Sequence, residues 1–328
     1  IRRPPRSTQS RSSAASDVYK RQVIGSCELS LNFAKILIAN EFKVSTMVAL
    51  SNENSTNNSV NTEDFSLLSG IPYFEADDIN SKKTITFLKE LKLDYILSAW
   101  PYFISKDVLD IAKYGVIGTH PTPLPRNKGR HPLHWMIAMG INMSSLSFYK
   151  MDESIDSGNI LIQEPFVVGV NINLANKNMI ASGRKGLMKL MTLLKRNPEY
   201  SGTSQDENGG NYWRKRDIND ITIDPRMSSS AIIRLVNSFL YPFPLAKLYF
   251  EKNSYFNITK ASNIKIDDLN KDWESYEYGY IFKSTMNSFN IRVDDAVINL
   301  EIDSSNEFLE NLVGKKIRPP SYYMIPVK

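Results

Sequence analysis

Apolar and polar residues alternate in blocks that predict helices and strands in turn along the first two thirds of the chain. Leu29, Phe33, Ile36 and Leu37 recur at the spacing of one helix face, and the run VSTMVAL at 44–50 is typical of a buried strand. This alternation predicts an α/β fold whose sheet is mostly parallel. The same pattern predicts helices at 82–92, 131–140 and 173–197, and strands at 94–99, 114–118, 144–151 and 159–168.

The pattern changes after a helix expected at 228–240. Short strand-like runs separated by turn residues follow between 245 and 302, which predicts a small β-rich C-terminal module. We therefore expect a catalytic domain at 23–205 and, at 206–328, a C-terminal helix plus a small β-rich domain. The Asn-rich stretch at 51–64 is polar enough to be a solvated loop.

Residues 1–22, rich in Arg and Ser, lack hydrophobic periodicity. We expect them to be a non-native leader, such as translated vector sequence, or a disordered one, and the first strand to begin only at Val23. They carry six Lys or Arg against one Asp, which equals the whole formal charge of +5. The rest of the chain is neutral and lacks the clustered uncompensated cations that nucleic-acid binding requires.

Cysteine content and hydropathy narrow the class of protein further. The single cysteine, Cys27, excludes an internal disulfide. No apolar run approaches the roughly 20 residues that a membrane-spanning helix needs. We expect a cytoplasmic protein that does not associate with membranes.

All three histidines of the chain lie between 118 and 135. His120 directly follows a predicted strand, at the sheet edge where open α/β folds bind ligands, and such a histidine suits general acid or base catalysis. Asp156 or Asp152, in the loop after the strand at 144–151, could orient the imidazole, and their spacing does not choose between them. Pro121, Pro123 and Pro125 keep the chain after His120 extended.

His131 and His134 stand three residues apart on a predicted helix, which raises the possibility of a metal site with His120. No cysteine or carboxylate lies at zinc-ligand spacing, and Pro132 and Trp135 are typical of a packed first helical turn. We therefore expect no metal and a structural role for both histidines.

Two motifs together resemble a known family. The run YGVIGTHPTPLPRNKGRHPLHWMIAMG, followed by SSLSFYKMDESIDSGNILIQ, resembles the signature of formyltetrahydrofolate-dependent formyltransferases, the family of methionyl-tRNA formyltransferase. That signature is roughly N-x-H-x-S-L-L-P-x-x-R-G-x-x-P and, later, D-x-x-x-D-x-G. The resemblance covers about residues 23–200.

The resemblance implies a Rossmann-like catalytic domain that uses N10-formyltetrahydrofolate as co-substrate. His120 matches the catalytic histidine of the family and Asp156 its catalytic aspartate. Gly118 stands where the family has an asparagine, and the loss of one oxyanion donor costs on the order of a hundredfold in rate. A backbone N–H, a water or protonated His120 would have to replace that amide. The residues expected at the folate are Ala99, Trp100, Pro101, Tyr102, Asp152, Ser154 and Ile155.

Charge and length favour one acceptor class within the family. Residues 217–328 carry 13 Lys or Arg and 15 Asp or Glu, which disfavours tRNA. The purine-pathway enzyme of the family resembles a single domain, whereas this chain continues beyond it. We therefore predict a sugar N-formyltransferase, which acts on a nucleotide-linked amino sugar, as in polysaccharide biosynthesis.

The residues expected at the sugar nucleotide are Arg126, Lys128, Gly129, Arg130, Tyr212, Trp213 and Arg214. For the basic members, plain solvated loop charge is an equally weighted alternative. Two other functions remain open. One is a methionyl-tRNA formyltransferase, and the other is a non-catalytic folate- or sugar-nucleotide-binding homologue that lost activity through Gly118. The sequence allows a homodimer.

Overall fold

The computed structural model describes residues 19–206, 209–265, 272–303 and 307–323. The chain divides into two compact units, unit 1 (residues 1–55 and 60–117) and unit 2 (residues 56–59 and 118–328). The expected leader therefore falls mostly outside the described residues, and the expected boundary between 205 and 206 stays a prediction.

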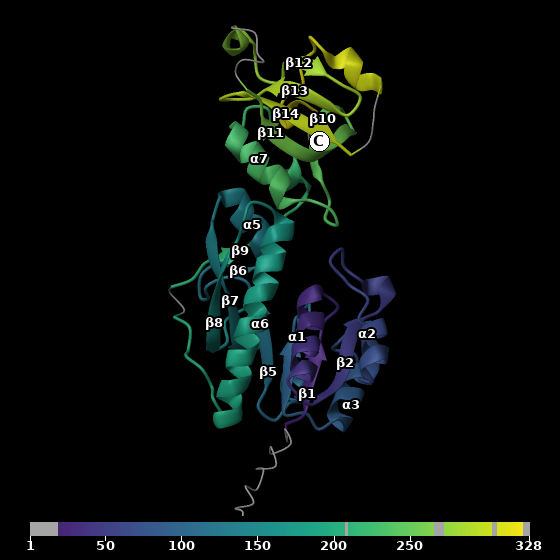
Figure 1. The fold of residues 1–328 in the computed structure, drawn as a ribbon, viewed down its shortest axis with the longest axis vertical. Helices are drawn as coiled ribbons and strands as arrows, with labels where there is room; N and C mark the ends of the chain where they lie inside the picture. Colours follow the sequence, from purple (N-terminus) through teal and green to yellow (C-terminus); the bar gives the residue numbers. More distant parts are fainter. Residues whose placement is uncertain (1–18, 207–208, 266–271, 304–306, 324–328) are drawn as a thin grey trace, which may run out of the picture. The chain divides into compact units, whose positions relative to one another are not determined.

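Unit 1 consists of parallel strands with helices between them (Figure 1). Its elements are β1 (Arg21–Ile24), α1 (Glu28–Ala39), β2 (Val44–Leu50), η1 (Asn52–Asn54), α2 (Glu63–Ser69), β3 (Tyr73–Ala76), α3 (Lys82–Glu90), β4 (Tyr95–Ser98), α4 (Lys106–Leu109) and the first part of β5 (Val116–His120). Strand β1 pairs with β2 and with β4, and β2 pairs with β3. The strand interiors are apolar and buried, as Val23, Met47 and Ile96 illustrate.

Two features of unit 1 differ from the expectation. Strand β1 begins at Arg21 rather than at Val23, and the side chain of Arg21 is buried with its guanidinium 4.9 Å from the centre of the Phe42 ring. Helix α2 begins at Glu63, inside the loop expected at 51–64, and neither α2 nor β3 was predicted. In α2 the one buried residue is Ser66, so this helix has no apolar stripe to reveal it.

The N-terminal part of unit 2 continues the sheet with an antiparallel pair and a long helix. Its elements are the end of β5, β6 (Lys128–Gly129), α5 (Pro132–Met139), β7 (Met143–Lys150), β8 (Ile160–Val167), α6 (Ile172–Arg196) and β9 (Tyr212–Trp213). Helix α6 lies along β7 and β8 (Figure 1). A Cβ on Gly186 of α6 would lie 2.6 Å from the Phe148 ring, so glycine permits this close packing.

Seven strands form one large, mostly parallel sheet in the order β3-β2-β1-β4-β5-β7-β8, with helices flanking it. The α/β fold expected from the alternating pattern is thereby confirmed. Within the described residues, no helix is both long enough and apolar enough to cross a bilayer.

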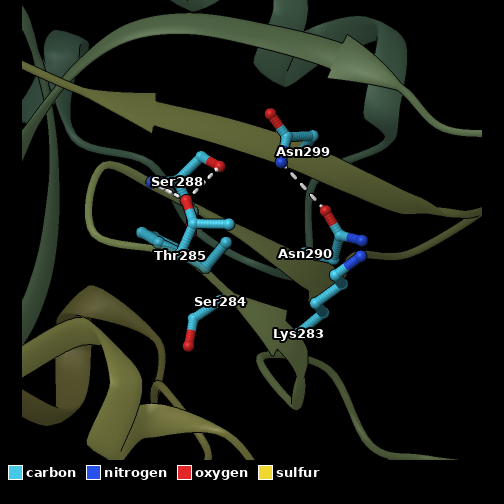
Figure 2. Close-up of a pocket in the computed structure, with 7 residues that line it drawn as sticks. Lys283, Ser284, Thr285, Ser288, Asn290 and Asn299 are labelled. Carbon is cyan, nitrogen blue, oxygen red and sulfur yellow. Dashed lines mark hydrogen bonds between the residues drawn. The ribbon is translucent and has the colours of Figure 1, made fainter.

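The C-terminal part of unit 2 is an antiparallel sheet packed on one helix, as expected. Its elements are η2 (Ile218–Ile221), α7 (Ser229–Ser238), β10 (Ala246–Glu251), β11 (Ser254–Asn263), η4 (Trp273–Ser275), β12 (Ile281–Ser284), β13 (Ser288–Arg292), β14 (Val297–Ile302), η5 (Glu307–Leu312) and α8 (Pro320–Tyr323). The strand order is β10-β11-β14-β13-β12, and Ile232 and Val236 of α7 share a core with Phe256 and Leu300. A polar depression of about 240 Å³ lies over β12 and β13, where Asn299 Nδ2 donates to Asn290 Oδ1 at 2.9 Å (Figure 2).

Helices α5 and α7 meet around a buried histidine. His134 Nδ1 donates to the Ser238 carbonyl oxygen at 2.6 Å, and its ring stacks on Phe239 at a centroid distance of 4.5 Å. The guanidinium of Arg216, also buried, donates to the carbonyl oxygen of His134 and to Ser238 Oγ. Burial lowers the pKa of His134 to about 4, although the Ser238 carbonyl opposes the shift. The histidine is therefore neutral in the folded protein at neutral pH.

This buried neutral histidine predicts acid-sensitive stability. The unfolded chain binds a proton at His134 below about pH 6.5, whereas the folded protein does so only below about pH 4. The free energy of unfolding should consequently fall as the pH drops from 6.5 to 4, by about 3 kcal/mol from this residue. Urea unfolding at several pH values measures the slope. His134→Leu should flatten it, and because both proteins keep His131, an unchanged slope in the variant would refute the assignment.

Candidate active site

His120 is the last residue of β5 and is only 4% exposed. The apolar residues Val116 and Ile117 bury the start of the strand and carry the chain to this position. Beyond His120 the proline-containing loop turns back, because Thr122 Oγ1 donates to the Arg126 carbonyl oxygen at 2.8 Å. The strand and this turn together hold the imidazole in one place.

Asp156, in the loop between β7 and β8, is the carboxylate that faces His120. Its Oδ2 lies 3.4 Å from His120 Nδ1, and its backbone has a positive φ of 51°, a conformation that aspartate tolerates better than most residues. Asp152 Oδ1 instead accepts the backbone N–H of Ser154 at 2.9 Å. The geometry thus pairs His120 with Asp156, the carboxylate that the resemblance implies and that spacing alone did not distinguish from Asp152.

Two further donors bind the Asp156 carboxylate. The Tyr149 hydroxyl donates to Oδ1 at 2.8 Å, and the backbone N–H of Gly129 donates to Oδ2 at 2.9 Å. Gln205 Nε2 holds the loop itself by donating to the carbonyl oxygens of Asp156 and Gly158. Sequence reasoning missed these contacts, because a residue's place on a strand does not reveal which loop its hydroxyl reaches.

The second nitrogen of His120 also faces an oxygen. Nε2 lies 2.8 Å from the carbonyl oxygen of Asn127, which can only accept, so this nitrogen carries the hydrogen. Both ring nitrogens therefore face acceptors, and an imidazolium, with one N–H on each nitrogen, satisfies both of them. A neutral His120 acting as a base at Nε2 must exchange Asn127 for the group that it deprotonates.

The loops expected at the folate present apolar side chains to solvent, each in its own unit. After β4, residues 99–102 form an irregular loop in which Tyr102 is 50% exposed. Between β7 and β8, Ser154 is exposed, and Ile155 is 62% exposed. Exposed aromatic and aliphatic groups of this kind suit an aromatic ligand.

Four of the residues expected at the sugar nucleotide lie on two short paired strands, β6 and β9. Lys128 is only 5% exposed, and its Nζ donates to Ser157 Oγ at 2.9 Å. Strands β6 and β9 pair Lys128 with Tyr212 and Gly129 with Trp213. A Cβ on Gly129, which has a φ of 99°, would lie 2.3 Å from the Trp213 carbonyl oxygen. Lys128 is thus directed at the loop that carries Asp156 rather than at solvent.

The three arginines expected at the sugar nucleotide lie in different surroundings. Arg126 and Arg130 are exposed in the loop after His120. Arg214 makes two hydrogen bonds with Asp220, at 2.6 and 2.7 Å, and lies over the Trp135 ring. The hydrogen bond to Asp220 raises the pKa of Arg214. Arg214 is therefore already paired with a carboxylate in this structure.

His131 and His134 lie at the start of α5, and their surroundings are structural. His131 is the N-cap residue with a φ of 55°, and burial with the nearby Arg130 lowers its pKa. The part of the chain that the structure describes contains no group of three or more His, Cys, Asp or Glu side chains arranged to hold a metal. The depression in Figure 2 lies on the C-terminal sheet and shares no residue with the His120–Asp156 pair.

Known proteins resemble this chain in sequence and in fold. Residues 33–182 match the formyl transferase family. Methionyl-tRNA formyltransferase from Clostridium tetani is 29% identical over 226 residues, which is 68% of this chain and 70% of that protein.

Two solved structures share the fold. The N-formyltransferase from Helicobacter canadensis, in complex with folinic acid and dTDP-3-aminofucose, matches with a TM-score of 0.63 at 17% identity, over 87% of this chain and 99% of its own. Methionyl-tRNA formyltransferase from Clostridium thermocellum matches with a TM-score of 0.55 at 17% identity, over 76% and 94%. The segment that matches the formyl transferase family contains both His120 and Asp156, and the methionyl-tRNA formyltransferase from Clostridium tetani resembles this chain over 68% of its length.

Proposed function

We propose that the protein transfers a formyl group from N10-formyltetrahydrofolate to the amine of a nucleotide-linked amino sugar. The observation that carries the proposal is the pairing of His120 Nδ1 with Asp156 Oδ2 at 3.4 Å, in a shielded position inside the segment that matches the family. Formyl transfer needs one proton acceptor for the attacking amine, and this pair supplies it. Neither a metal nor a thiol nucleophile has a role in the proposed reaction.

The folate supplies the activated formyl group. Residues of the two loops expected to bind it fit an aromatic ligand, because Tyr102 and Ile155 expose apolar surface next to backbone groups of irregular chain. We assign Ala99 to Tyr102, together with Asp152, Ser154 and Ile155, to this binding role as part of the proposal.

His120 is the proposed general base. As the amine forms its bond to the formyl carbon it must lose a proton, and His120 accepts it after Nε2 leaves the Asn127 carbonyl oxygen. Asp156 then faces an imidazolium, whose charge it compensates. His120 returns the proton to the folate nitrogen as the bond between that nitrogen and the formyl carbon breaks.

Charge supports a sugar acceptor over tRNA. The chain beyond residue 22 is neutral, and residues 217–328 carry two more acidic than basic side chains, counted as 15 against 13. A tRNA-binding module would need uncompensated cations, which release counterions from phosphates. The Helicobacter canadensis enzyme, whose structure contains a dTDP-linked amino sugar, matches 87% of this chain. Methionyl-tRNA formyltransferase from Clostridium thermocellum matches 76% of it.

The exposed arginines are the proposed diphosphate contacts. Arg126 and Arg130 lie between His120 and α5, and both residues are exposed. Lys128 is a weaker candidate for this role than the two arginines, because it is buried and donates to Ser157. Tyr212, at 61% exposure, is the proposed stacking partner of the nucleotide base.

We expect Asp156→Asn to lower kcat at least about a hundredfold, because an amide cannot compensate the imidazolium. His120→Ala should abolish formyl transfer. Steady-state kinetics with N10-formyltetrahydrofolate and an amino-sugar nucleotide, together with circular dichroism, measure activity and folding. Asp110→Asn, an exposed carboxylate that contacts Lys106, is the matched control and should keep full activity. Full turnover in either active-site variant contradicts the proposed roles.

A screen of acceptors tests the substrate class. We expect turnover with one of a set of dTDP-, UDP- and GDP-linked amino sugars and none with methionyl-tRNA. The release of tetrahydrofolate measures the turnover. Formylation of methionyl-tRNA alone would replace the proposal with the tRNA function. Folate binding by calorimetry without turnover on any acceptor would instead support the non-catalytic alternative that Gly118 raises.

A further inference from the structure

Strand β7 carries a buried tyrosine, Tyr149, whose hydroxyl contacts the carboxylate of Asp156. Tyr149 is 4% exposed, and its hydroxyl donates to Asp156 Oδ1 at 2.8 Å. The other carboxylate oxygen, Oδ2, receives the Gly129 N–H and faces His120 Nδ1. The tyrosine therefore holds the one oxygen that His120 does not face, which prevents rotation of the carboxylate.

The phenol is suited to be a permanent donor. Burial, with the nearby negative charge of Asp156, raises the pKa of Tyr149 well above its ordinary value. The hydroxyl consequently keeps its hydrogen throughout the range in which an enzyme works. A donor of this kind differs from a water molecule because the strand determines its position.

Gly118 leaves the space that this tyrosine occupies. A Cβ at residue 118 would lie 2.9 Å from Tyr149 Cζ and 2.8 Å from Met151 Cγ, both closer than real Cβ contacts. The methionine is flexible and can move aside, whereas the Tyr149 ring is held by its buried surroundings and by Asp156. A side chain at 118 and the tyrosine in its present position therefore exclude each other.

We propose that Tyr149 is a positioning residue for formyl transfer, which orients Asp156 toward His120, and that Gly118 is small because it must admit the tyrosine ring. This inference rests on the proposed function. It also explains why an asparagine is absent at 118, since the asparagine would collide with Tyr149. Gly118→Asn alone is therefore expected to lower activity rather than raise it.

Tyr149→Phe tests the hydroxyl while the ring stays in place. We expect kcat to fall about tenfold to a hundredfold, as when the partner that orients a reacting group is lost, with unchanged KM for both substrates. KM should not change because the buried tyrosine does not touch substrate. Tyr95→Phe, which removes a hydroxyl from another buried tyrosine, is the matched control and should leave kcat unchanged. Equal kcat in Tyr149→Phe and the unaltered enzyme overturns the proposal.

A double-mutant cycle tests the coupling between Gly118 and Tyr149. If Gly118→Ala acts by displacing the hydroxyl, it should lower kcat in the unaltered background and add less than about threefold once Tyr149→Phe is present. If the fall in kcat of the double variant equals the product of the two single falls, residue 118 acts independently of the tyrosine. The proposal that Gly118 makes room for the Tyr149 ring would then be wrong. Thermal unfolding of all four proteins confirms that the comparison is between folded enzymes.

An activity-independent measurement separates this inference from the proposed function. The chain has only three histidines, so the ring nitrogens of ¹⁵N-histidine-labelled protein can be assigned with a His120→Gln variant. Tyr149→Phe should shift the His120 nitrogen resonances and leave those of His131 and His134 in place. Unshifted His120 resonances overturn the positioning role even if formyl transfer is confirmed. A clear shift in a protein without turnover on any acceptor supports the positioning of Asp156 while the proposed function fails.

Discussion

A carboxylate that is almost removed from water must be bound by donors on every side, and Asp156 meets this requirement. Its side chain is 13% exposed, and the Tyr149 hydroxyl, the Gly129 N–H and the His120 ring face its two oxygens. Leaving a buried charge with fewer partners would cost several kcal/mol. These three groups come from β7, β6 and the end of β5, so the orientation of one side chain depends on the packing of three strands.

The sequence predicted the large sheet because its strands are short apolar runs between amphipathic helices. The run at 44–50 corresponds to β2 as expected, and the helix expected at 173–197 corresponds to α6 within one residue at each end. Elements that bury little were missed, as with α2 and β3. The start of β1 was missed for another reason. Arg21 is a buried charged residue at the first position of the strand, and hydrophobic periodicity does not reveal that its side chain packs on Phe42.

The proposed catalytic pair could be predicted from the sequence, because His120 follows a predicted strand and the resemblance to the formyltransferase motif favours Asp156 over Asp152. Their partners could not, since Tyr149, the Gly129 backbone and Gln205 reach Asp156 through tertiary packing. The sequence also did not show which charged side chains are exposed to solvent. Lys128 counts as a cation in any composition, yet in the folded chain it is buried and donates to Ser157.

Residues 203–206 and 209–216 lie between the two parts of unit 2, and several of them contact the surroundings of the His120–Asp156 pair. Thr203 exchanges two backbone hydrogen bonds with Ile160, Gln205 holds the loop that carries Asp156, and Trp213 accepts the N–H of Arg130. In a recombinant of two related proteins, this segment should therefore come from the same parent as the part of unit 2 that contains His120 and Asp156. A chimera that exchanged C-terminal modules at residue 205 would replace Trp213, the partner of Arg130, whereas a crossover beyond Arg216 would keep all three residues.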